Sequence, residues 1–176
     1  DGAPVILAST LNDYAGDTTI GPTGPGWWND NAAHTMLTLG NSEVIPHGAG
    51  AGNVTIVPNL GGAGRDAALN LNGFSETING LSGSGRVFNA TATFSTLTVG
   101  SADATSTYDG VILYDVNLVK TGNGRLTLTG NNTYTGTTDV QGGTLRINGT
   151  HTGGGTITVA AVATLDGTGS AGAVTI

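Results

Sequence analysis

Short runs of alternating apolar and polar residues, separated by glycines, constrain this chain more than any other feature. The pattern is clearest in residues 118–149, where Leu126 and Leu128 alternate with threonines, and Leu145 and Ile147 alternate with polar residues. A period of two is that of a β-strand with one buried face. Glycines lie between the runs, where a chain can turn without a steric penalty at Cβ. The stretch therefore predicts several short strands joined by tight turns.

The same stretch carries a longer motif. Lys120-Thr-Gly-x-Gly-x-Leu-Thr-Leu-Thr-Gly-x-Asn-x-Tyr-x-Gly, followed by Gly142-Gly-Thr-Leu, resembles the autotransporter-associated β-strand repeat, also called the passenger-associated transport repeat. This repeat recurs along very long secreted bacterial proteins. The resemblance implies a right-handed parallel β-helix in which the motif residues are architectural. With their counterparts near the N-terminus, these residues are Lys120, Gly122, Gly124, Leu126, Leu128, Gly130, Asn132, Tyr134, Gly136, Gly143, Leu145, Asn12, Tyr14 and Gly16.

Composition agrees with an all-β chain and narrows the classes of partner. Glycine contributes 31 of the 176 residues but proline only 5, which is unlike a collagen or a proline-rich linker. Only 10% of residues are charged and the net charge is −7, which argues against binding to nucleic acid or an anionic membrane. No apolar run reaches the roughly 20 residues of a membrane-spanning helix. The absence of cysteine is compatible with a cytosolic protein and with many bacterial surface proteins. We interpret the chain, which shows no signal peptide, as a mature product or a segment.

The sequence also resembles itself at an offset of 120 residues. Residues 1–56 align with residues 121–176 without a gap, so that Asn12 falls on Asn132. A repeat of this kind implies stacked equivalent units. We therefore expect residues 1–176 to form one β-solenoid domain of about one and a half 120-residue units.

Two folds fit the pattern of short strands and Asn-Gly turns. Such turns mark hairpins in an antiparallel β-sandwich and corners in a solenoid. The family resemblance favours the parallel β-helix, and the antiparallel β-sandwich is the alternative. Hydrogen-bond connectivity between the strands separates the two.

Residues 22–31 (PTGPGWWNDN) interrupt the strand pattern and predict a loop that leaves the coil. Trp27 and Trp28 could form a stacking surface for a sugar or a partner protein, with Asn29 and Asp30 as polar neighbours. The alternative is that one tryptophan caps the apolar interior and the other covers a seam.

Metal and catalytic signals are isolated. Residues 61–69 fit the calcium-binding nonapeptide pattern with Asp66 as the carboxylate, but in one copy, whereas that site needs successive copies. Asp103, Asp109 and Asp115 are spaced six apart, which does not match a coil, and no basic residue lies near them as a lyase would require. The three histidines are too far apart in sequence to suggest a metal cluster. We therefore predict no cofactor, with calcium at Asp66 as the alternative.

These observations predict a non-enzymatic structural protein, extracellular or on a bacterial cell surface. A β-helix has unpaired strand edges at its ends, and stacking of such ends generates filaments. The first expectation is a rod that stacks end to end into a fibre or forms part of a stalk or adhesin scaffold. Its partners would be other copies or further repeats of the chain. The alternative is a module that binds glycans or a host or cell surface through the Trp27-Trp28 loop, and a polysaccharide lyase or hydrolase ranks third.

Overall fold

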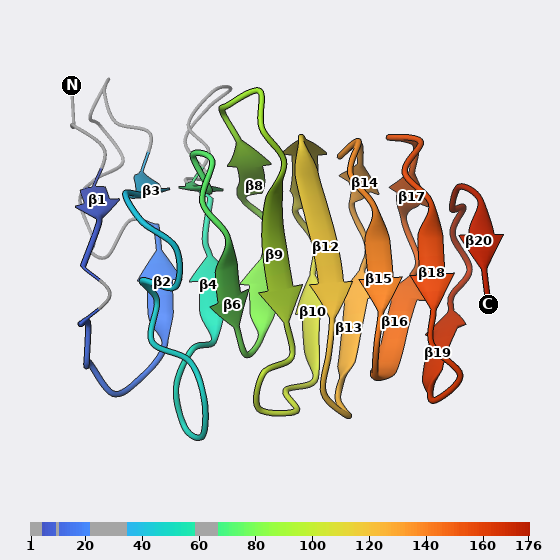
Figure 1. Ribbon diagram of the computed structural model, residues 1–176, viewed down its shortest axis with the longest axis horizontal. Coiled ribbons are helices and arrows are strands. Elements are labelled where there is room, and N and C mark those ends of the chain that lie inside the picture. Colours follow the sequence, from blue (N-terminus) through green and yellow to red (C-terminus); the bar gives the residue numbers. More distant parts are fainter. Residues whose placement is uncertain (1–4, 10, 22–34, 59–66) are drawn as a thin grey trace.

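The computed structural model describes residues 5–9, 11–21, 35–58 and 67–176, and the regular secondary structure in these ranges consists of β-strands without a helix. The strands are stacked along one axis, with β1 toward one end and β20 at the other (Figure 1). No helix in the described part of the chain is long and apolar enough to cross a membrane.

The strands form three long sheets and one short pair. Sheet 1 contains, in spatial order, β1 (Val5–Leu7), β3 (Met36–Leu39), β5 (Ala68–Asn70), β8 (Arg86–Asn89) and β11 (Val111–Tyr114). Sheet 2 contains β2 (Thr18–Ile20), β4 (Val54–Ile56), β7 (Leu81–Gly83), β10 (Ser106–Tyr108), β13 (Arg125–Leu128), β16 (Gly143–Ile147) and β19 (Ala163–Asp166). Sheet 3 contains β6 (Glu76–Ile78), β9 (Ser95–Val99), β12 (Val116–Lys120), β15 (Thr138–Val140), β18 (Ile157–Val159) and β20 (Val174–Thr175). The short pair is β14 (Asn131–Asn132) with β17 (Thr150–His151).

Strands that follow one another along the chain lie in different sheets, and each pairs with a strand of a neighbouring coil. The strands β11, β12 and β13, for example, contribute one strand each to sheets 1, 3 and 2. All the strand pairings among the described residues are parallel. This connectivity confirms the parallel β-solenoid and rules out the antiparallel β-sandwich for this part of the chain.

The length of a coil changes along the axis. In sheet 2, Leu126 pairs with Leu145 after 19 residues, and Leu145 pairs with Leu165 after 20. Near the N-terminus, Thr18 pairs with Val54 only after 36 residues. The C-terminal coils are thus short and regular, whereas the N-terminal coils contain longer connections between equivalent strands.

The core is a continuous apolar column between the sheets. Leu126, Leu128 and Leu145 point inward and are 0–1% exposed, and Ile147 and Leu118 are similarly buried. In parallel pairing, identical positions of neighbouring coils lie one above another, so each inward residue packs on its equivalent. In the alternating runs of the sequence, the apolar residues therefore face the inside of a coil and the polar residues face outward.

The proposed 120-residue unit has a local counterpart in the structure. The Tyr14 hydroxyl is hydrogen-bonded to that of Thr18 at 2.8 Å, and the Tyr134 hydroxyl to that of Thr138 at 2.6 Å. The strands that follow are β2 in sheet 2 and β15 in sheet 3, so the two copies occupy different sides of the coil. The equivalence of whole units therefore stays a prediction.

Candidate functional site

The turns of the C-terminal coils are joined by side-chain hydrogen bonds that span one coil. The Asp103 carboxylate accepts the backbone N–H of Asn123 at 2.7 Å, and this bond holds the pKa of Asp103 below its usual range. Asp109 and Asp115 each accept a hydrogen bond from the hydroxyl of a threonine 20 residues further on, at 2.6 and 2.7 Å. The three aspartates therefore bind the next coil at successive turns, and the six-residue spacing is the length of a side of the coil.

Lys120 joins two coils from the interior. It occupies an inward position at the end of β12 and is fully buried. Its Nζ donates to the carbonyl oxygens of Thr121 at 2.5 Å, Gly122 at 3.1 Å and Gly142 at 3.2 Å. Burial lowers the pKa of the ammonium group, and the carboxylate of Asp103 opposes this effect. The prediction that no basic residue lies near the three aspartates is therefore wrong for Asp103, because the turn brings Lys120 close to it. The one lysine of the chain is thus a structural cation that satisfies turn carbonyls which have no strand partner.

Two glycines of the motif are required by the same turns. Gly122 has φ 68° and Gly143 has φ 61°, in the left-handed region that side chains with a Cβ rarely adopt. A Cβ at Gly122 would also overlap the carbonyl oxygen of Gly100, and one at Gly143 that of Gly124. The motif glycines therefore allow successive turns to lie in contact.

Asn132 and Tyr134 stabilise the segment that follows strand β13 of sheet 2. Asn132 is buried and its Oδ1 accepts the backbone N–H of Ile112 in the preceding coil at 2.9 Å. The buried ring of Tyr134 stacks on His151 of the next coil, with ring centroids 4.2 Å apart and planes 21° apart. Burial raises the pKa of the Tyr134 hydroxyl to about 12, so this group stays protonated and keeps its bond to Thr138.

The predicted aromatic loop and calcium residue lie outside the described residues. Trp27, Trp28, Asn29 and Asp30 fall in the range 22–34, and Asp66 falls in the range 59–66. A role for these residues therefore stays a prediction.

A buried carboxylate near the N-terminal end was not anticipated. Glu76 is the first residue of β6, faces inward and is 0% exposed. Its Oε2 accepts the backbone N–H of Val44 at 2.9 Å, and its Oε1 accepts that of Ile45 at 3.1 Å. Val44 and Ile45 are buried but belong to no strand. The side chain therefore supplies the acceptors that a neighbouring strand would otherwise provide.

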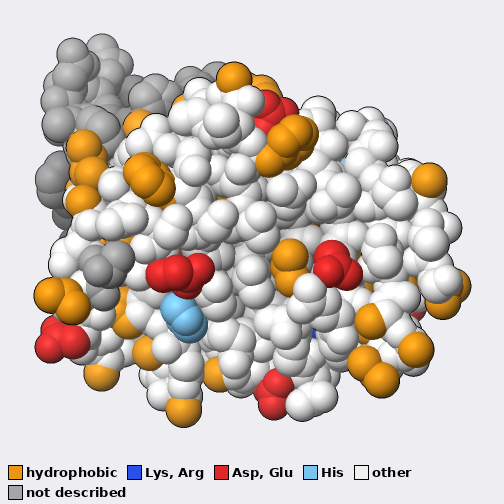
Figure 2. Space-filling view, in the orientation of Figure 1, with side chains coloured by type: hydrophobic (Ala, Val, Ile, Leu, Met, Phe, Trp, Pro, Cys, Tyr) orange, Lys and Arg blue, Asp and Glu red, His pale blue; other side chains and the backbone are white. Residues whose placement is uncertain are grey.

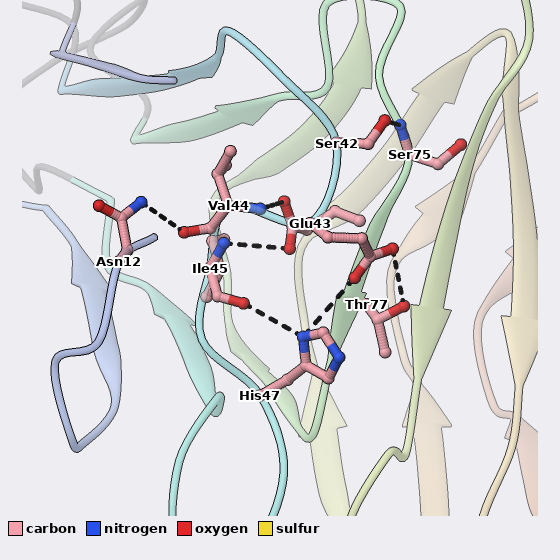
Figure 3. Close-up of polar contacts among 9 residues, drawn as sticks. Asn12, Ser42, Glu43, Val44, Ile45, His47, Ser75 and Thr77 are labelled. Atoms are coloured by element: carbon pink, nitrogen blue, oxygen red, sulfur yellow. Dashed lines mark hydrogen bonds and ion pairs between the residues drawn. The ribbon is translucent and has the colours of Figure 1, made fainter. Parts of the chain in front are cut away.

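Two further titratable groups lie beside this carboxylate. His47 Nδ1 is 3.6 Å from Oε2 of Glu43 and 3.3 Å from the carbonyl oxygen of Ile45. The Thr77 hydroxyl donates to Oε1 of Glu43 at 3.0 Å (Figure 3). One ligand atom from each of Glu43, His47 and Glu76 lies within 4.8 Å of the other two. We call these three residues the Glu43–His47–Glu76 cluster.

One member of the cluster, Glu76, is buried, whereas the other two are exposed to solvent. Burial raises the pKa of Glu76 from 4.5 to about 7, the N–H groups of Val44 and Ile45 lower it, and the Glu43 carboxylate raises it. Glu43 and His47 are exposed, so a solute can reach the cluster from the surface. On the face shown in Figure 2, histidine and acidic side chains are visible, whereas blue lysine or arginine side chains are nearly absent.

The sequence contained part of the signal for this cluster. Glu43 and His47 are four residues apart, a spacing that can place two ligands together, although the three histidines themselves lie far from one another in the sequence. Glu76 lies 33 residues after Glu43 and reaches the cluster because the coil returns there, which no local pattern indicates.

Comparisons with known proteins agree with this architecture. The fold makes the chain a parallel β-solenoid, and residues 118–147 match the family described as passenger-associated-transport-repeat. Over 120 residues, or 66% of this chain, it is 34% identical to the protein named "Adhesin BmaC autotransporter" of Brucella suis biovar 1 (strain 1330). The chain spans about 3% of the length of that relative. No solved structure matches the chain. The predicted resemblance is confirmed for residues 118–147, which match the passenger-associated transport repeat.

Proposed function

We propose that this chain is a segment of the extracellular, non-catalytic scaffold of a bacterial surface or secreted protein, of the stalk or adhesin type. The observation that carries the proposal is the unbroken stack of coils, joined by parallel strands in three sheets and by side chains 20 residues apart. The passenger-associated transport repeat supports an extracellular location, and the name of the Brucella relative supports the adhesin setting.

A solenoid of this kind suits a spacer. Each coil contacts only its neighbours, so length is set by the number of coils and a further coil needs no change elsewhere. Each coil adds about 4.8 Å to the axis. Carboxylates in the described turns form hydrogen bonds to the next coil and so hold the coils together, as at Asp103, Asp109 and Asp115.

Two kinds of partner follow from this role. Strand edges at the end of a coil can pair with further repeats of the same chain or with another copy, which would build a longer rod or a fibre. A glycan or a host or cell surface is the second partner, and the Trp27-Trp28 loop is its candidate contact.

Electron microscopy of the purified chain at several concentrations tests the assembly. Filaments with an axial repeat that is a multiple of about 4.8 Å would support end-to-end stacking. Discrete short rods would contradict self-assembly and assign the chain to the interior of a longer scaffold.

Two binding and activity assays test the rest of the proposal. Titration with a panel of glycans should quench tryptophan fluorescence if the loop binds sugar, and the Trp27→Ala/Trp28→Ala double variant should abolish binding of the panel to the chain. Incubation with acidic polysaccharides, with and without calcium, should leave them uncleaved. Measurable cleavage would overturn the non-catalytic assignment.

A further inference from the structure

Both glutamates of the sequence belong to one cluster, and they reach it from different coils. Glu43 lies with His47 in the connection between β3 and β4, whereas Glu76 opens β6. Donor atoms of the three side chains lie within 4.8 Å of one another. The scaffold function proposed above assigns no role to this arrangement.

The negative charge of the cluster has little compensation. Glu76 is fully buried, and a second carboxylate lies beside it. Among the described residues, no lysine or arginine forms an ion pair with Glu43 or Glu76, and the contact of opposite sign within the cluster is that of His47 Nδ1 with Oε2 of Glu43 at 3.6 Å. A buried carboxylate without a cationic partner is costly, and the cost is relieved by a proton or by a bound cation. This charge balance points to a cation independently of the distances between the donors.

The donor set selects among cations. Calcium takes six to eight oxygen ligands, and an imidazole nitrogen is a poor choice for it. One imidazole and two carboxylates suit zinc, which binds nitrogen and oxygen at about 2.0–2.2 Å and is commonly four-coordinate. Donors around one zinc ion lie roughly 3–4 Å apart at these bond lengths. Small rotations of the exposed Glu43 and His47 side chains would bring the three donor atoms, now within 4.8 Å of one another, to these distances.

The surroundings of Glu76 are those of an oriented metal ligand. The N–H groups of Val44 and Ile45 each hold one carboxylate oxygen, which fixes the group while leaving lone pairs for a metal. His47 would give up its contact with the Ile45 carbonyl oxygen and present a deprotonated ring nitrogen. Three protein ligands leave a fourth position for water, on the solvent side of the cluster.

We propose that Glu43, His47 and Glu76 form a zinc site that ties two neighbouring coils together. The site lies where the chain at Val44 and Ile45 forms no strand and where the Glu76 side chain already replaces backbone pairing. A metal there strengthens the link between the long N-terminal coils.

The test is a titration of the whole purified chain after treatment with EDTA and removal of the chelator. Isothermal calorimetry with zinc chloride should show one saturable site, and calcium chloride should show none. Cobalt(II) should give the visible absorption of a four-coordinate nitrogen and oxygen site. The Glu43→Gln and His47→Gln variants should each bind zinc at least about 10-fold more weakly. Both residues are exposed, so these variants should keep the circular dichroism of the native solenoid.

Asp139→Asn is the matched control. Asp139 is a surface carboxylate on β15, several coils from the cluster, and its removal should leave the zinc affinity unchanged. The absence of saturable zinc binding would overturn the proposal. So would calcium binding as tight as zinc, or equal zinc affinities in the two cluster variants and the control.

Discussion

Replacing Lys120 with methionine tests whether the buried cation of the repeat stabilises the solenoid. Methionine keeps most of the length of the side chain but removes the ammonium group. The carbonyl oxygens of Thr121, Gly122 and Gly142 then lose a donor at 2.5–3.2 Å. Two of these oxygens belong to the turn after β12 and one to the next coil, so the change weakens a turn and a junction together.

The magnitude follows from two opposing effects. A hydrogen bond to a charged group contributes about 1.5–3 kcal/mol, and three acceptors are affected. Removing the buried ammonium also removes a desolvation cost of several kcal/mol. Thr121, Gly122 and Gly142 are all half-buried residues, so water can replace part of the lost hydrogen bonding. We expect the Lys120→Met variant to lose about 2–4 kcal/mol of unfolding free energy, which corresponds to a melting temperature lower by roughly 10 °C.

Urea unfolding at pH 7 followed by circular dichroism measures this loss. Arg125→Met is the matched control, because it removes a cation of the same motif from an exposed position and should change stability by less than about 0.5 kcal/mol. The neighbours of Lys120 in the inward ladder are Val99 and Val140. If Lys120→Met were as stable as the native chain, an aliphatic ladder would suffice and the reasoning would be refuted.

Three further predictions concern single side chains. In EDTA, the free energy of unfolding should fall by about 3 kcal/mol as pH rises from 4.5 to about 7, because in this range the native state holds a proton on Glu76 that the unfolded state has released. Urea unfolding curves at pH 5 and pH 8 should show this fall, and the Glu76→Gln variant should show a flatter dependence of stability on pH. Tyr134→Phe removes the bond to Thr138 and should cost about 1 kcal/mol in the same assay, and an unchanged midpoint would contradict that role. Gly122→Ala must adopt φ 68° against a backbone oxygen and should lower stability by about 2 kcal/mol or more by thermal melting, whereas a neutral effect would show that the turn can relax.

The fold was predictable where residue type and position agree. Leu126, Leu128 and Leu145 alternate with polar residues, and the motif around them identified the parallel solenoid. The strands Thr18–Ile20 and Thr138–Val140 each contain a single apolar residue and carry no comparable apolar alternation. They are strands because neighbouring coils supply their hydrogen-bond partners, and local preference does not report that pairing.

The side-chain contacts between coils were harder to predict because they depend on coil length. The spacing of Asp103, Asp109 and Asp115 was visible, but its meaning appears only once the partners are known to lie 20 residues further on. In the N-terminal coils the return distance is longer, so Glu76 could not be assigned to the side of Glu43 from the sequence. The positions of Trp27 and Trp28 stay untested.

The parallel ladders also determine how the rod responds to a pulling force along its axis. The backbone hydrogen bonds between coils run along that axis, so tension opens them one coil at a time instead of shearing a whole sheet. A coil of 20 residues, such as that between Leu145 and Leu165, would release about 65–70 Å of chain while giving up about 4.8 Å of folded length. The 36 residues between Thr18 and Val54 would release about 120 Å. A solenoid pulled in this way would lengthen in steps of unequal size and would absorb work as successive coils open.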